Sequence, residues 1–185
     1  MSVSPEWLTA IGTLGSFIVI GGSAVAALVQ LRHMRASNQI DALLSLERDF
    51  RTAEMQGALH YVQTHLENKL AEQRYRNELA ERGFIDANLH PEVTVCNWFN
   101  EMGTLVKNGL VSEKTFMDLF AKLISYYWRI LSPAIAVMRR NRGEAQYHDF
   151  EFLAIRAEQW LTQHPDGSFP KGVRRTPLPD PWIHA

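Results

Sequence analysis

The chain has 185 residues, with 19 Lys and Arg against 20 Asp and Glu, and a net charge of −1 at pH 7. This balance excludes the strongly basic proteins that bind nucleic acid without sequence preference. Its single cysteine excludes an intramolecular disulfide and fits a reducing compartment. The mean hydropathy of −0.19 is typical of a globular domain, but the average hides an uneven distribution along the chain.

Residues 7–31 contain no charged side chain. As a helix rising about 1.5 Å per residue, this run would extend roughly 38 Å, enough to cross the roughly 30 Å hydrocarbon core with some tilt. We interpret it as a transmembrane helix that follows a short external N-terminus, residues 1–6. Two alternatives stay open: a buried helix of a soluble protein, and a signal peptide cleaved near Ala24-Val25-Ala26, which resembles a cleavage site.

All Lys and Arg residues follow this run, beginning with Arg32 and Arg35 beside the membrane. Because short flanks rich in Lys and Arg are retained in the cytoplasm, they predict the orientation of a membrane helix. We expect a bacterial inner-membrane protein that crosses the bilayer once, with its N-terminus outside and its remaining residues in the cytoplasm.

Small side chains gather on one side of the predicted membrane helix, opposite large residues such as Phe17 and Leu28. The face consists of Gly12, Gly15, Ser16, Val19, Ser23 and Ala26. Within lipid, helices associate through close backbone approach, which small residues permit. We therefore expect a homo-oligomer, although glycine is also common in membrane helices generally.

The rest of the chain predicts an all-α fold, because no run of alternating β-branched residues with hairpin signals occurs. We expect the membrane helix to continue as a cytoplasmic extension over residues 32–56, where Gly57 bends or ends it. A helical domain then covers residues 57–164. Its first, polar helix spans about residues 60–82.

Three further helices are predicted within this domain. The first begins at Pro91 and carries an apolar stripe of Val95, Phe99, Met102 and Val106. The second is capped by Ser112, turns Phe116, Leu119, Phe120, Leu123, Tyr127 and Leu131 inward, and kinks or ends at Pro133. The third places Tyr147, Phe150, Leu153, Ala157 and Leu161 on one face. Residues 165–185 hold five of the eight prolines and predict a disordered or surface-draped tail.

Several segments carry a family resemblance: NQIDALLSLERDF behind the anchor, then NWFNEMGTLVKNGL, YYWRILSP and the closing FEFLA. With the N-terminal anchor, they resemble a bacterial domain-of-unknown-function family of small, singly anchored helical proteins. The resemblance covers roughly residues 7–161. It implies architecture and membrane location, since this family carries no established activity.

The order of anchor, long helix and helical domain also resembles the membrane-anchored accessory proteins of RNA-targeting CRISPR systems. Those proteins form membrane pores and carry a degenerate HEPN fold, whose signature is an Arg followed after four to six residues by a His. RGEAQYH, from Arg142 to His148, has this spacing. The resemblance implies that His148 acts as general acid or base and that Arg142 holds the scissile phosphate.

Gly143 stands where active HEPN proteins usually have a polar residue, which argues against cleavage. In the alternative interpretation, Arg142 is a solvated residue at a helix junction. His148 is then a helix-surface residue flanked at helical spacing by Glu144 and Glu151.

Arg139, Arg140 and Arg142 form a basic patch, which makes RNA a possible partner. We expect no cofactor and no metal site, because the chain lacks a phosphate-binding glycine loop, a GxSxG elbow, paired cysteines and a second histidine cluster. Cys96 lies on the apolar side of its helix and is interpreted as an inert buried thiol.

These observations together predict a membrane-anchored helical protein that acts by self-association, as a pore or a membrane scaffold, in stress or phage defence. Catalysis is not the favoured interpretation. One alternative is a membrane-tethered HEPN-like ribonuclease. The other is an adaptor that recruits an unknown cytoplasmic partner to the membrane.

Overall fold

Helices form all the regular structure among the residues that the structure describes. The computed structural model describes residues 5–182, and within the first helix the side chains of residues 14–17, 19–31, 34, 41 and 44–50. The described residues contain no strand, which confirms the all-α prediction. The chain divides into two units, Met1–Thr52 and Ala53–Ala185.

The described part of the first unit contains one helix, α1 (Pro5–Phe50), of 46 residues. Its window Leu14–Leu31 has a mean hydropathy of 1.9, and none of it is buried. The helix is therefore long and apolar enough to span a membrane, and it continues well beyond the apolar run, as predicted. It ends at Phe50 rather than at Gly57, because the chain turns at residues 51–52, where the Thr52 hydroxyl donates to the Asp49 carbonyl at 2.9 Å.

The second unit contains α2 (Ala53–Thr64), α3 (Leu66–Ala71), α4 (Gln73–Ala80), α5 (Pro91–Lys107), α6 (Glu113–Arg142) and α7 (His148–Gln163). The single polar helix predicted over residues 60–82 is wrong, since the chain breaks at His65 and Glu72 to form three short helices. These breaks let Leu66, Tyr75 and Leu79 all turn into the core. Gly57 lies inside α2.

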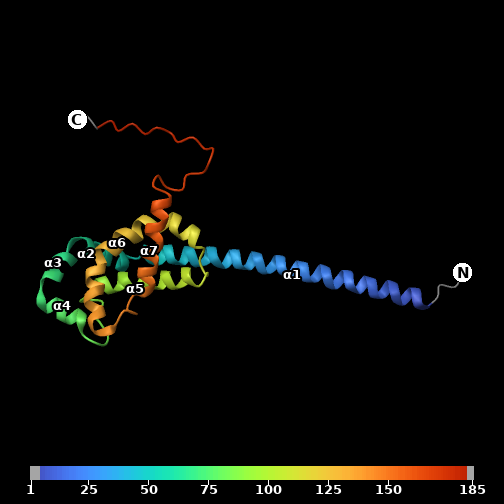
Figure 1. The fold of residues 1–185 in the computed structure, drawn as a ribbon, viewed down its shortest axis with the longest axis horizontal. Helices are drawn as coiled ribbons and strands as arrows, with labels where there is room; N and C mark the ends of the chain where they lie inside the picture. The colour runs from blue at the N-terminus through green and yellow to red at the C-terminus, as the bar shows by residue number, and fades with distance from the viewer. Residues whose placement is uncertain (1–4, 183–185) are drawn as a thin grey trace. The chain divides into compact units, whose positions relative to one another are not determined.

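The longer helices of the second unit pack around one core (Figure 1). α7 packs against both α5 and α6, while α2 packs on α5 and α4 on α6. Phe99 of α5, Phe116 of α6 and Phe150 of α7 are fully buried, and the rings of Phe99 and Phe150 stack with centroids 4.6 Å apart. The apolar stripe predicted for α5 is buried throughout, and that of α7 is buried except at its last residue, Leu161, which is half-buried.

Helix α6 follows its predicted pattern in part. The Ser112 side chain caps it by accepting from the Thr115 backbone N–H at 3.4 Å, as expected. Leu119 was expected inside but is 61% exposed, because Met117 and Ala121 face the core instead. Pro133 lies inside α6 and does not end it, since the helix continues to Arg142.

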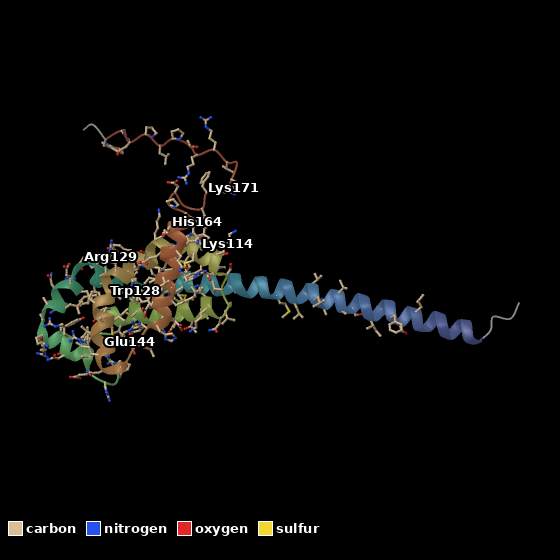
Figure 2. All side chains as sticks on the ribbon, viewed as in Figure 1. Lys114, Trp128, Arg129, Glu144, His164 and Lys171 are labelled. Atoms are coloured by element: carbon tan, nitrogen blue, oxygen red, sulfur yellow. The ribbon has the colours of Figure 1, made fainter. Side chains whose placement is uncertain are left out.

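The proline-rich tail leaves the end of α7 at His164 (Figure 2). Its described residues, 165–182, contain no helix and are exposed. The Arg175 guanidinium lies 5.0 Å from the centroid of the Phe169 ring, a local cation–π contact within the tail.

Candidate functional site

Helix α5 carries polar side chains that hold the start of α7. The Asn100 side-chain oxygen accepts hydrogen bonds from the backbone N–H groups of Asp149 at 3.2 Å and Phe150 at 3.4 Å. Tyr147, at the N-cap position of α7, provides no side-chain cap. Because the first N–H groups of a helix lack partners within it, Asn100 replaces the missing cap from another helix.

The Asp149 carboxylate extends this junction. It is 4% exposed, accepts a 2.7 Å hydrogen bond from the Thr104 hydroxyl, and forms an ion pair with Lys107. Burial raises the pKa of Asp149, but the hydrogen bonds from Lys107 and Thr104 outweigh burial and hold the pKa below its usual value. The negative charge also suits the positive end of the α7 dipole.

Gly103 allows α5 and α7 to come this close. A β-carbon at Gly103 would lie within 3.0 Å of three atoms of Asp149: its backbone O, its carbonyl C and its Cβ. Asn100, Gly103, Thr104 and Lys107 all belong to the segment NWFNEMGTLVKNGL. Much of that segment therefore serves to dock α7. The spacing of these four residues places them on one face of a helix, which could have indicated this role.

Arg142, a candidate catalytic residue, binds backbone carbonyls at the end of α4. Its Nη1 donates to Leu79 O at 2.7 Å, and its Nη2 donates to Glu81 O and, at 3.3 Å, to Gly83 O. The last carbonyls of a helix lack partners within it, so this guanidinium caps the C-terminal end of α4.

His148, the other candidate, opens α7 and is exposed. Its Nδ1 lies 2.9 Å from the Ala145 carbonyl oxygen, so Nδ1 donates the proton there. Its Nε2 lies 3.1 Å from the Asp149 carboxylate and 3.4 Å from Lys107 Nζ. Within the described part of the chain, no hydrogen bond or ion pair joins His148 to Arg142, so the two side chains serve different junctions.

The predicted basic patch consists of three arginines with different surroundings. Arg139 pairs with Glu151 at 2.7 Å and with Glu144 at 3.4 Å. Arg142 is engaged with carbonyls, as described above, and Arg140 is exposed. Much of the positive charge of this patch is therefore already compensated by the protein itself.

A buried polar network that the sequence did not predict connects α2, α4 and α5. Glu92 is 0% exposed, and both its carboxylate oxygens lie 2.7 Å from the Tyr75 hydroxyl, which donates to them. His90 Nδ1 lies 3.2 Å from the same carboxylate, and the Tyr61 hydroxyl donates to Tyr75 at 3.1 Å. Burial, the hydrogen bonds with Tyr61 and Glu92, and the nearby carboxylate raise the pKa of Tyr75, so its hydroxyl stays protonated.

The predicted packing face of the membrane helix lies on α1. Its described residues are all exposed: Gly15, Ser16, Val19, Ser23 and Ala26. The exposure of Gly12 and the side chains of the flanking Arg32 and Arg35 lie outside what the structure describes. Cys96 is fully buried, as expected, and burial raises the pKa of its thiol.

No group of three or more His, Cys, Asp or Glu side chains that could hold a metal ion occurs among the residues described. The model of DUF4760, a family defined as a domain of unknown function, matches residues 17–157 of the chain. The chain belongs to the DUF4760 family. No curated protein and no solved structure shows significant similarity to it.

The DUF4760 match begins inside the apolar run of α1 and ends within α7. It includes the whole α5 segment that docks α7, and it leaves the proline-rich tail outside. The predicted resemblance to a domain-of-unknown-function family is therefore confirmed. The resemblance to CRISPR accessory proteins stays a prediction.

Proposed function

We propose that this DUF4760 protein is a single-pass membrane protein of the bacterial inner membrane that acts by self-association through α1. The observation that carries the proposal is the window Leu14–Leu31, which is helical, free of charge and has no buried residue. A soluble protein would cover such a helix with other apolar side chains, because exposed apolar surface of this length is unfavourable in water.

In this proposal, Arg32 and Arg35 retain the rest of the chain in the cytoplasm. The small-residue face of α1, which includes Gly15, Ser23 and Ala26, brings the anchors of neighbouring copies together. Such an assembly serves as a pore or as a scaffold, in stress or phage defence, and its cytoplasmic bundle is where a further partner would bind.

A ribonuclease activity has less support. The Arg142 guanidinium donates to three backbone carbonyls, and no hydrogen bond or ion pair among the described residues joins it to His148. In a ribonuclease of this type the arginine and the histidine act on the same phosphate, so their side chains must face one substrate position.

The anchor can be tested with one matched pair of substitutions in α1. Ile20→Arg places a charge inside the apolar window, whereas Leu44→Arg places it beyond the window at a position that is likewise exposed. An arginine at the centre of a membrane helix costs about 2.5–3.5 kcal/mol of insertion free energy. We expect the unaltered protein and Leu44→Arg to resist carbonate extraction from membranes, and Ile20→Arg to be released in part. Release of the unaltered protein would contradict the proposal.

A further inference from the structure

A pocket of about 540 Å³ opens on the bundle where residues 82–87 face the start of α5 and the link between α6 and α7. Its volume lies within the range of small-molecule sites, roughly 300–1,000 Å³. Neither the membrane anchor nor the docking of α7 requires this space. Its lining therefore gives information beyond the proposed function.

The charged side chains that line the pocket are both arginines. Arg82 and Arg142 contribute guanidinium groups, and no Asp or Glu is among the lining residues that the structure describes. The Arg82 Nε donates to the Asn141 carbonyl at 3.1 Å, while neither of its Nη nitrogens is engaged in a hydrogen bond with described residues. The pocket thus has positive charge and free donors.

The structure holds these groups in place before any ligand arrives. The Arg142 guanidinium is fixed by its carbonyl partners on residues 79, 81 and 83. Asn141 Nδ2 donates to Ala80 O at 2.8 Å, so the ends of α4 and α6 are joined in both directions. A guanidinium that is already held in place contributes its positive charge to the pocket without a further loss of conformational entropy.

Asn97 adds a neutral donor to the lining of the pocket. Its Oδ1 accepts a 3.1 Å hydrogen bond from the Tyr147 hydroxyl, which leaves the amide nitrogen to donate elsewhere. Tyr147 is 6% exposed and has φ 57° and ψ 33°, a left-handed conformation that non-glycine residues rarely adopt. Such strained residues are concentrated at functional sites.

An apolar wall completes the pocket. It is formed by Phe84, Ile85, Ala87 and Val93. Phe84 is 95% exposed, so its ring is accessible to a ligand in the pocket. A ligand that matches these surroundings has an anionic group for the free donors of Arg82 and Asn97, beside the positive charge of Arg142. It also has a flat apolar body that contacts Phe84 and its apolar neighbours.

We propose that this pocket binds a small organic anion, a phosphate or carboxylate that carries an aromatic or similarly flat apolar group. Phenyl phosphate and benzoate are suitable probes because they share that body and differ in the anionic group. Inorganic phosphate is the control for the apolar body, because it has the anionic group without an aromatic ring. Benzyltrimethylammonium is the control for the sign of the charge, because it has an aromatic ring with a positive group.

The test is isothermal titration calorimetry on the full chain in detergent, with blank micelles subtracted. We expect saturable binding of phenyl phosphate, benzoate or both, with one site per chain, and the stronger of the two identifies the anionic group. Arg82→Gln should weaken binding at least about tenfold, since a charge-assisted hydrogen bond is lost. Arg140→Gln removes an exposed arginine outside the pocket and should change affinity less than about twofold.

Asn97→Asp provides a second variant that does not depend on Arg82. It keeps the oxygen that accepts from Tyr147 but places a negative charge in the pocket, so it should also weaken binding about tenfold. The proposal is overturned if neither anion binds, if the cation or inorganic phosphate binds as tightly, or if Arg140→Gln weakens binding as much as Asn97→Asp.

Discussion

Gly103 of α5 faces Asp149 of α7 so closely that no β-carbon fits between them. The added carbon would lie within 3.0 Å of the Asp149 backbone oxygen, its carbonyl carbon and its Cβ. The same aspartate receives the Thr104 hydroxyl and the Lys107 ammonium group from α5. The contact between these two helices therefore depends on a missing side chain as much as on hydrogen bonds.

Gly103→Ala should destabilise the bundle. Because backbone atoms of α7 cannot move aside alone, the helices must separate, which costs about 1–3 kcal/mol or more. Gly57→Ala is the matched control, since nothing lies within 4 Å of its β-carbon and α2 continues through it. The control should be neutral or more stable by about 0.5–1 kcal/mol. Urea unfolding followed by circular dichroism measures both, and equal stability of the two variants would contradict the packing.

Asp149 should make stability depend on pH. Its folded pKa lies below the unfolded value of about 3.9, so its contribution is complete above that value and is lost as pH falls through the folded pKa. At pH 7, Asp149→Asn should lower the free energy of unfolding by about 1–3 kcal/mol. The difference between the two proteins should stay constant from about pH 5 to 8 and shrink below about pH 4. A difference that grows in acid would contradict this assignment.

The Tyr75 hydroxyl should matter because it serves a fully buried carboxylate. Tyr75→Phe removes the donor that both oxygens of Glu92 share, and leaving a buried polar group without this donor costs about 1–3 kcal/mol. Tyr126→Phe removes the hydroxyl of an exposed tyrosine and should change stability by less than about 0.5 kcal/mol. Thermal unfolding of the two variants compares them directly, and equal shifts would show that the network is not stabilising.

The helical pattern of the sequence predicted the apolar stripe of α5, most of that of α7, and the long first helix. The apolar face of a helix can be predicted because it depends only on the spacing of apolar residues along the chain. The three short helices from α2 to α4 were not predicted, because their breaks at His65 and Glu72 contain neither proline nor glycine. The periodicity of α6 was compatible with a buried Leu119. This residue is exposed because of the way α6 packs on its neighbours, which the periodicity does not contain.

The site was harder to predict than the fold. The spacing of Arg142 and His148 suggested one catalytic pair. In the structure each side chain instead contacts a residue distant in the chain: Arg142 donates to Leu79 O, and His148 lies beside Lys107. The sequence did not predict the burial of Glu92. This residue follows Pro91 at the start of a helix, where acidic side chains are normally exposed to solvent. Long-range partners of this kind depend on tertiary structure, which no local pattern contains.

Self-association of the anchor is tested most directly by cysteine crosslinking in native membranes. Ser23→Cys lies on the small-residue face of α1, and Val25→Cys lies on the opposite face at the same depth. The native Cys96 is fully buried and does not interfere. On mild oxidation, we predict a covalent dimer for Ser23→Cys and little or none for Val25→Cys. Equal crosslinking at both positions, or no dimer at either, would contradict association through this face.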